Sequence, residues 1–375
     1  MAPIPPSPLP RLIVYYQTHH TPQPKNKHIS VLPLITQPGI SLTHLILAAI
    51  HINSDPLGLT LNDHLPSHPR FDTLWAELRI LQASGVKVLG MLGGAAKGSY
   101  ARLDASQAQF DVYYSPLAAL IRERGLDGLD LDVEEEMSLA GVVRLIDRLK
   151  SDFGPGFIIT LAPVAAALVS PNPAHNLSGF SYGELERQRG DQISWYNAQF
   201  YCGWGDCSNP AMYEMILLRG WKKEKIVVGM VTNPENGSGW VPWEVFGAVV
   251  PLMIGAGVGG RDKFGGVMGW EYFNALPGGR ERPWEWARGM TRLLRGDADQ
   301  GNQGGRIGED GRRGNERGEG GIVKSGDGKV ERLASTEVDP DEDGDGNGEG
   351  EGEGERMGGA PVPRDFEYHS DGNDS

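Results

Sequence analysis

The chain has 375 residues, with 35 Lys and Arg against 49 Asp and Glu, and a formal net charge of −14. This length allows one large α/β domain or two ordinary domains, each with a sizeable core. Between Gly296 and Ser375 there are 9 basic and 22 acidic residues, so that segment carries nearly all of the excess charge. The near-neutral remainder shows no Lys and Arg clustering, which argues against a nucleic-acid partner.

The first segment, residues 1–10, is rich in proline and leads directly into an apolar run. It has neither the basic start nor the apolar stretch of a secretory signal, so the sequence predicts a cytoplasmic protein. Secretion would require that the start of the coding region is misassigned. The apolar run Val245–Val258 contains Pro251 and is too short for a membrane span, so we expect a soluble monomer.

Eight short apolar runs follow one another along the chain, and several are separated by segments with helical spacing of apolar residues. The runs are Leu12–Gln17, Leu42–Ile50, Val86–Leu92, Gly128–Glu134, Phe157–Ala162, Ile193–Tyr201, Ile226–Val231 and Gly265–Trp270. The clearest helical segments are Phe71–Ala83, Ser115–Arg124, Ser138–Phe153 and Ala211–Trp221. This alternation predicts parallel strands joined by right-handed crossovers.

Eight such units in residues 11–295 predict a (β/α)8 barrel, the TIM-barrel architecture. The nearly continuous apolar runs are typical of strands that are covered on both faces. In this fold, active residues lie at the carboxyl ends of the strands, and Glu134 ends the fourth run.

After Arg295 the pattern changes to Gly, Glu, Asp and Arg, with few large apolar residues. Such a composition cannot bury enough surface to fold, so residues 296–375 are predicted to be a disordered acidic tail. The sequence does not decide what that tail does.

The two cysteines, Cys202 and Cys207, are too few for a disulfide-rich scaffold. Their spacing has no nearby pair of histidines, which argues against a zinc site. We expect two ordinary thiols and no metal, although the sequence leaves open whether they are bonded to each other.

The stretch Asp127–Glu134 reads DGLDLDVE and carries the strongest chemical signal. Because side chains alternate along a strand, Asp130, Asp132 and Glu134 share one face and the apolar residues share the other. Carboxylates placed this close in a buried strand repel one another and shift their pKa values. Such a site can separate an acid from a base. The next residues, Glu135 and Glu136, are expected to be solvated.

This stretch resembles the DGxDxDxE signature of glycoside hydrolase family 18 at every defined position. Further segments are similar to other strands of that family: Val86–Gly94, in which Met91 replaces a usual serine, Trp195–Tyr201, and Phe264–Phe273. Within the family, the chain is most similar to fungal endo-β-N-acetylglucosaminidases. The segments that carry this closer likeness include Pro10–Gln17, Phe157–Val164 and Gly269–Gly279.

The resemblance implies a retaining glycosidase without a cofactor, in which the 2-acetamido group of the substrate is the nucleophile. Glu134 would be the general acid and then the base, and Asp132 would hydrogen-bond the acetamido N–H. Asp130 would support Asp132, and Asp127 would hold the end of the strand.

The same resemblance gives roles to aromatic and amide residues of two later strands. Tyr201 would orient the acetamido oxygen, and Trp270 would form a floor beneath the distorted sugar. Gln199 and Asn197 share strand parity with Tyr201 and are expected to bind substrate at the barrel mouth.

Three functions remain open at this stage. The first is cleavage of the GlcNAc-β-1,4-GlcNAc bond in N-glycan cores, so that the partner is a glycan or glycoprotein that contains N-acetylglucosamine. The second is a chitinase, which cuts the same bond with the same residues. The third, disfavoured because Glu134 is present, is an inactive lectin for chitin-like sugars.

Overall fold

The computed structural model describes residues 9–22 and 24–296. Most of the predicted Pro-rich segment 1–10 and nearly all of the predicted tail 296–375 lie outside the described residues.

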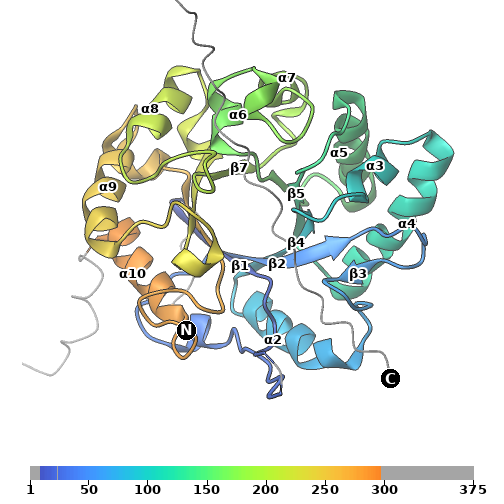
Figure 1. Cartoon of the computed structure of the whole chain (residues 1–375), viewed down its shortest axis with the longest axis horizontal. Coiled ribbons are helices and arrows are strands. Elements are labelled where there is room, and N and C mark those ends of the chain that lie inside the picture. Colours follow the sequence, from blue (N-terminus) through green and yellow to red (C-terminus); the bar gives the residue numbers. More distant parts are fainter. Residues whose placement is uncertain (1–8, 23, 297–375) are drawn as a thin grey trace, which may run out of the picture. The chain divides into compact units, whose positions relative to one another are not determined.

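Eight parallel strands close into a ring in which β1 pairs with both β2 and β9 (Figure 1). A ninth strand, β3, pairs antiparallel with the end of β2. In chain order the strands are β1 Arg11–Tyr16, β2 His44–His51, β3 Thr60–Leu61, β4 Lys87–Gly93, β5 Gly128–Asp132, β6 Ile158–Leu161, β7 Trp195–Gln199, β8 Ile226–Val231 and β9 Gly266–Trp270. The predicted TIM barrel is therefore confirmed.

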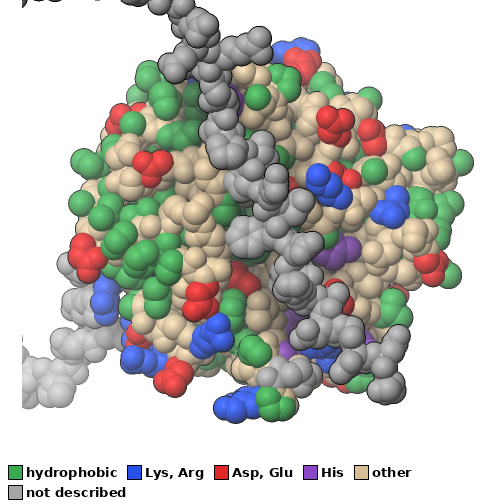
Figure 2. All heavy atoms as spheres, in the orientation of Figure 1, with side chains coloured by type: hydrophobic (Ala, Val, Ile, Leu, Met, Phe, Trp, Pro, Cys, Tyr) green, Lys and Arg blue, Asp and Glu red, His purple; other side chains and the backbone are tan. Residues whose placement is uncertain are grey.

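The helices surround this ring on its outside (Figure 1), and the face seen in Figure 2 carries scattered charged side chains of both signs. They are α1 Pro33–Thr36, α2 Asp72–Ala83, α3 Ser99–Leu103, α4 Gln107–Arg124, α5 Leu139–Phe153, α6 Ala165–Val169, α7 Tyr182–Arg189, α8 Ala211–Leu218, α9 Trp243–Gly255 and α10 Trp284–Arg295. Helix α4 begins eight residues before the predicted start at Ser115, after the capping residue Ser106. Its first half buries only Phe110 and Tyr114, which explains the weak apolar pattern there.

Alternation along the strands divides the apolar core into two parts. One part fills the ring and includes Ile13, Ile46 and Met268, whereas the larger part lies between the ring and the helices. In β5, Leu129 and Leu131 belong to the outer part. Their neighbours Asp130 and Asp132 therefore face the interior of the barrel.

The apolar run from Val245 to Val258 forms most of α9 and belongs to the barrel wall. The helix buries Phe246, Val250 and Met253, whereas Leu252 on its outer side is exposed. Within the described ranges, no helix combines the length and the apolar character that a membrane crossing needs.

Candidate active site

Asp130 forms the base of the site, inside the ring. Its Oδ2 accepts a hydrogen bond from the Tyr15 hydroxyl at 2.7 Å, and its Oδ1 accepts bonds from Thr160 Oγ1 at 2.5 Å and Asn197 Nδ2 at 3.0 Å. The side chain is fully buried. Burial raises the pKa of this carboxyl, and the three donors oppose that rise. Asp130 is thus fixed by neighbours from β1, β6 and β7.

Asp132 and Glu134 lie above Asp130, at the carboxyl end of β5, where the strand itself ends at Asp132. Gln199, the last residue of β7, bridges them. Its Nε2 lies 3.1 Å from Asp132 Oδ1 and 3.2 Å from Glu134 Oε1, and it also donates to the carbonyl oxygen of Ala162 at 2.9 Å. One amide therefore holds both carboxyl groups and is itself tied to the end of β6.

The electrostatics of this pair favour protonation. Burial raises the pKa of Asp132, and the charges of Glu134 and Asp130 raise it further. Burial also raises the pKa of Glu134, while the bonds from Gln199 and Asp132 act in the opposite direction. No Lys, Arg or His of the described chain forms an ion pair with either group. Two adjacent carboxyls without a cation titrate as a unit and retain one proton to a higher pH than an isolated acid.

Tyr201 follows the end of β7 and lies close to the acidic pair. Burial raises its pKa well above the usual value, and Asp132 and Glu134 add to the rise, so the phenol stays protonated. Its hydroxyl makes no hydrogen bond to another described residue, although the side chain is only 8 % exposed. The Tyr201 O–H is therefore free to donate to a substrate.

Trp270 ends β9 and packs edge-on against Tyr15, with ring centroids 5.6 Å apart. Its carbonyl oxygen accepts hydrogen bonds from Thr232 N at 2.8 Å and Asn236 Nδ2 at 3.2 Å. Tyr15 also donates a hydrogen bond to Asp130 of β5. The Trp270 indole therefore packs against a side chain whose position is fixed by Asp130. The side chain of Trp270 is partly exposed.

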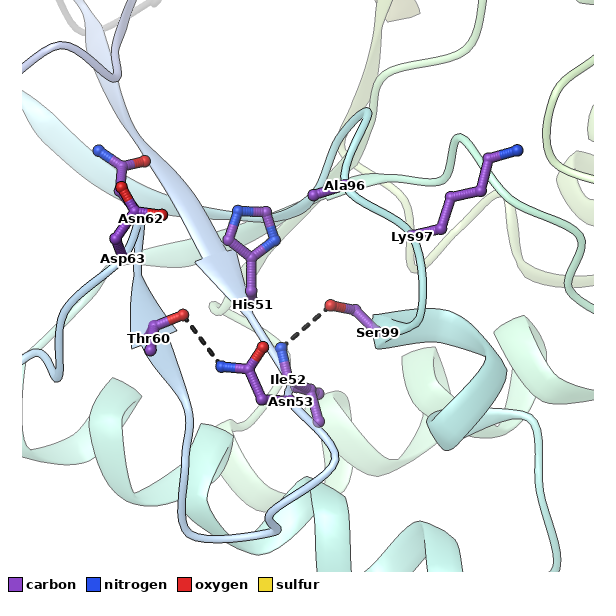
Figure 3. Close-up of a pocket in the computed structure, with 9 residues that line it drawn as sticks. All are labelled: His51, Ile52, Asn53, Thr60, Asn62, Asp63, Ala96, Lys97 and Ser99. Carbon is purple, nitrogen blue, oxygen red and sulfur yellow. Dashed lines mark hydrogen bonds between the residues drawn. The ribbon is translucent and has the colours of Figure 1, made fainter. Parts of the chain in front are cut away.

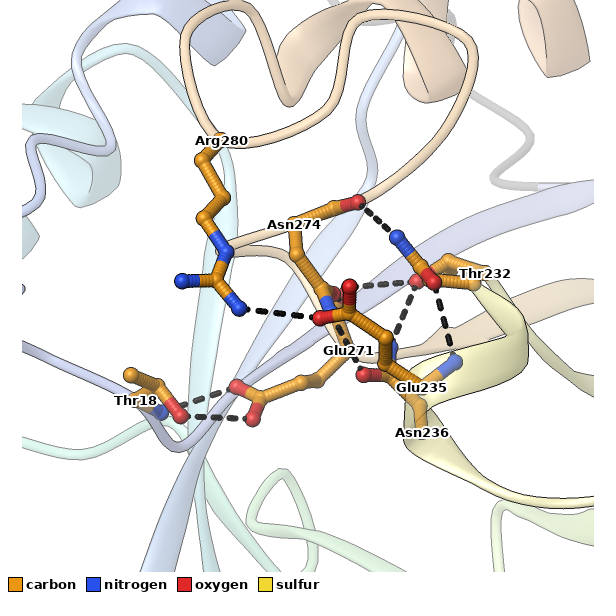
Figure 4. Close-up of polar contacts among 8 residues, drawn as sticks. Thr18, Thr232, Glu235, Asn236, Glu271, Asn274 and Arg280 are labelled. Carbon is orange, nitrogen blue, oxygen red and sulfur yellow. Dashed lines mark hydrogen bonds and ion pairs between the residues drawn. The ribbon is translucent and has the colours of Figure 1, made fainter.

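A buried carboxylate holds the backbone next to Trp270 (Figure 4). Glu271 Oε2 accepts bonds from the backbone N–H groups of Gln17 and Thr18, and its Oε1 accepts one from the Thr18 hydroxyl. Burial raises its pKa, and these bonds oppose the rise. The segment after β1 and the end of β9 are therefore joined through one side chain. Nearby, Glu235 forms an exposed ion pair with Arg280.

Asp127 lies at the other end of β5 and is not part of this group. It accepts hydrogen bonds from Gln82 Nε2, Lys87 Nζ and Val88 N at 2.8 to 2.9 Å. Although burial favours the protonated acid, these donors lower the pKa of Asp127. It fastens the start of β5 to β4 and α2.

Asn197 lies deeper in the barrel than Gln199 and Tyr201, at the level of Asp130, where a substrate at the mouth would not reach it. It is fully buried, and its amide is used by Asp130 and by the indole N–H of Trp195. A strand of one parity places successive side chains at different depths along the barrel axis, so Asn197 and Tyr201 share a face but not a level. Asn197 supports Asp130.

Three functional contacts escaped the sequence analysis. Tyr15 and Thr160 hold Asp130; each is a polar group in an otherwise apolar run, which is the signal that could have identified them. Glu135, expected to be solvated, is half-buried and accepts bonds from the backbone N–H groups of Gly98 and Tyr100. It orders the loop after β4.

Met91, which replaces a serine of the family pattern, lies in the barrel interior beside the site. Its side chain is buried. A Cβ atom added to Gly94 would lie 3.0 Å from Met91 Cε and 3.6 Å from Asp132 Oδ2, so Met91 lies close to the carboxyl group of Asp132. The wall here is apolar and gives Asp130 no further donor. The two cysteines are both free thiols, and burial raises the pKa of each.

Comparisons with known proteins match most of the described chain to one family. A family model described as glycosyl hydrolases family 18 matches residues 11–233. The fold is similar to a fungal endo-β-N-acetylglucosaminidase of that family, with 48% identity, a TM-score of 0.72, and coverage of 77% of this chain and 99% of that one. It is also similar to a chitinase from Aspergillus fumigatus, with 54% identity, a TM-score of 0.67, and coverage of 75% and 98%.

A curated relative, Endochitinase 37 of Trichoderma harzianum, is 24% identical over 220 residues. The match covers 54% of this chain and 64% of that relative, so the chain spans somewhat less than two thirds of its length.

Proposed function

The chain belongs to glycosyl hydrolase family 18, and on that basis we propose that it cleaves the GlcNAc-β-1,4-GlcNAc bond in N-glycan cores, with retention at the anomeric carbon. One observation carries this proposal. Asp132 and Glu134 are bridged by Gln199, have raised pKa values and lie beside the unpaired hydroxyl of Tyr201.

Glu134 supplies the proton. A carboxyl group with a raised pKa is protonated at a pH where an ordinary glutamate is not, so Glu134 can donate to the oxygen of the leaving sugar. The bond between the anomeric carbon and that oxygen breaks as the proton arrives. Glu134 is then a carboxylate, and it can accept a proton from the water that enters next.

The nucleophile in this mechanism comes from the substrate. The carbonyl oxygen of its 2-acetamido group attacks the anomeric carbon and forms an oxazolinium ring, which water then opens with overall retention. Asp132 accepts a hydrogen bond from the acetamido N–H, where positive charge develops, and Tyr201 donates to the acetamido oxygen. Interactions that strengthen as charge develops accelerate the reaction.

Neighbouring residues hold these groups in place. Tyr15, Thr160 and Asn197 fix Asp130, and a fixed negative charge at Asp130 favours a proton on the pair above it. Trp270 provides the flat surface for the sugar whose bond is cut. We expect this arrangement to need no cofactor.

The relatives support two substrates. The likeness to a fungal endo-β-N-acetylglucosaminidase favours N-glycans, while the 54% identity to a chitinase makes chitin the alternative. Digesting a high-mannose glycoprotein and chitotetraose side by side separates them. A shortened glycan on the glycoprotein supports the proposal, whereas shortened chitotetraose with an untouched glycoprotein replaces it with the chitinase.

A lectin function would be a different class of activity. It requires a site that binds N-acetylglucosamine chains without cutting them, and the presence of Glu134 beside Asp132 argues against it. If the wild-type protein bound such chains, turned over neither substrate and was unchanged by Glu134→Gln, the glycosidase proposal would be wrong.

A further inference from the structure

A polar cavity of about 360 Å³ opens at the carboxyl ends of β2 and β4, separate from the catalytic carboxylates. His51, the last residue of β2, lies in the middle of its lining (Figure 3). In the ring, β2 is adjacent to β4, and β4 is adjacent to β5. With neighbouring strands about 4.8 Å apart, His51 and the acidic strand are roughly 10 Å apart across the mouth. The size is within the usual range for small-molecule sites, about 300–1,000 Å³.

Both walls of this cavity are held rigidly. On one side, Asn62 has a positive φ of 50° and bonds through its side chain to Ala49 N and to the carbonyl oxygen of Gln17. On the other side, the hydroxyl of Ser99 accepts a bond from Ile52 N, and Glu135 accepts bonds from Gly98 N and Tyr100 N. A site whose walls are already ordered loses little entropy when a ligand binds.

Three ionisable side chains at the cavity are left without partners. Nδ1 of His51 is buried and has no hydrogen-bond partner, and the side chains of Asp63 and Lys97 form no hydrogen bond or ion pair with any other described residue. Figure 3 shows the imidazole between Asp63 on one side and Lys97 on the other. Burial lowers the pKa of His51, so its ring is neutral near pH 7 and can both donate and accept. A buried polar atom without a partner is costly unless a ligand or water satisfies it.

The chemistry of these groups favours a neutral ligand with many hydroxyls. Asp63 and Lys97 have opposite charges, so an anion or a cation would meet one like charge. Sugar hydroxyls can donate to a carboxylate and accept from an ammonium group at the same time. The apolar part of the lining comes from Ile52 and Ala96, and no Phe, Tyr or Trp lines the cavity.

We propose that this cavity binds a mannose unit of an N-glycan, remote from the bond that is cut, through Asp63, His51 and Lys97. The inference rests on the proposed N-glycan substrate and adds a specificity determinant to it. A branched glycan can place sugars in this side cavity while its core lies over Trp270. A linear chitin chain has no branch to place there.

Binding to the Glu134→Gln protein tests this assignment, because the ligand then stays intact. Calorimetric titration would compare a high-mannose oligosaccharide that ends in one N-acetylglucosamine with chitotetraose. We expect Asp63→Asn and Lys97→Gln each to weaken binding of the mannose oligosaccharide roughly tenfold, with less than a twofold change for chitotetraose. The matched controls are Asp191→Asn and Lys222→Gln, exposed residues that precede β7 and β8 at the opposite end of the barrel.

The outcomes separate this inference from the proposed function. Weakening of both ligands to the same extent, or of neither, overturns the mannose site, even if the wild-type protein cuts the glycoprotein. If the wild type leaves the glycoprotein uncut but Asp63 and Lys97 still control mannose binding, the N-glycosidase proposal fails and the cavity remains a mannose site.

Discussion

The two ends of β5 place the same kind of side chain in opposite electrostatic settings. At the amino end, Asp127 has three donors, including the Lys87 ammonium group, and its pKa is lowered. At the carboxyl end, Asp132 and Glu134 share the amide of Gln199, have no cation, and their pKa values are raised. Only a few residues of one strand separate the two settings.

The difference shows what each end of the strand does. A carboxylate with a cation and directed hydrogen bonds stabilises the fold, because its charged form is favoured. Carboxylates that crowd together without a cation cost stability, yet they can hold and transfer a proton at a higher pH than an isolated acid can. In a (β/α)8 barrel, this division between a stabilising end and a reactive end is expected from the architecture.

Replacing Glu134, which carries the proton, should reduce activity more than any other change considered. Glu134→Gln keeps the size and the hydrogen-bond acceptor but cannot donate the proton, so kcat/KM on the preferred substrate should fall by about 10²–10⁴-fold. Glu136→Gln is the matched control, since Glu136 is exposed and forms no hydrogen bond or ion pair with another described residue. A Glu134→Gln enzyme with more than a tenth of wild-type activity would rule out Glu134 as the acid.

Removing Gln199, which donates to both Asp132 and Glu134, tests how the carboxyl end of β5 controls the pKa of the acid. The hydrogen bond from Gln199 lowers the pKa of Glu134 against the effect of burial. Gln199→Ala should therefore move the basic limb of the kcat/KM profile to higher pH and reduce its maximum by about tenfold. A basic limb that stays in place, or moves to lower pH, would show that Gln199 does not control the acid.

The two ends should also differ in how their stability depends on pH. The lowered pKa of Asp127 means that its stabilisation is complete above about pH 4 and disappears as the pH falls through the folded value. Asp127→Asn should thus lower the free energy of unfolding by about 1 kcal/mol at pH 7, after allowance for partial solvent exposure, and by much less at pH 3.

Asp132 should show the opposite sign. Its raised pKa means that the folded state holds a proton more tightly than the unfolded state, so wild-type stability falls as the pH rises from about 4 towards the folded value. Asp132→Asn should then be more stable than wild type at pH 8, by on the order of 1 kcal/mol. Urea unfolding of both variants at a series of pH values measures these slopes, and slopes of the same sign would contradict the comparison.

The smallest expected effect concerns another carboxylate, Glu271, which is buried at the mouth but has three donors of its own. Glu271→Gln removes the charge but keeps one carbonyl oxygen, which can accept from the N–H groups of Gln17 and Thr18 while its NH₂ group faces the Thr18 hydroxyl. We expect KM to rise a few-fold as Trp270 loosens, with a smaller change in kcat. Glu235→Gln, in the exposed ion pair nearby, is the control. A fall confined to kcat would instead give Glu271 a part in the chemical step.

The architecture could be predicted from the sequence, because eight apolar runs with helical segments between them are typical of a (β/α)8 barrel. Each predicted run coincides with a strand to within two residues. The two-residue β3 was missed because it is too short to show a pattern. Strand parity also placed Asp130 and Asp132 on one face of their strand, and the structure shows that this face is the interior of the ring.

The depth of a side chain along the barrel axis and its hydrogen-bond partners could not be predicted in the same way. Parity gives the face of a side chain but not its level, so the sequence did not show that Asn197 lies below the mouth, bonded to Asp130. The bonds from Tyr15 and Thr160 to Asp130 join strands that are far apart in the chain. The apolar Met91 beside the site is visible in the sequence, but its effect depends on packing around Gly94.

The most direct test of the central claim concerns the nucleophile. Hydrolysis should be measured for a chromogenic chitobioside and for the analogue that carries a hydroxyl in place of the 2-acetamido group on the sugar whose bond is cut. If Asp132 and Tyr201 act on the acetamido group, the first substrate is cleaved with retention and the second is not cleaved at a detectable rate. Comparable cleavage of both would contradict the account, because the nucleophile would then belong to the protein or to water.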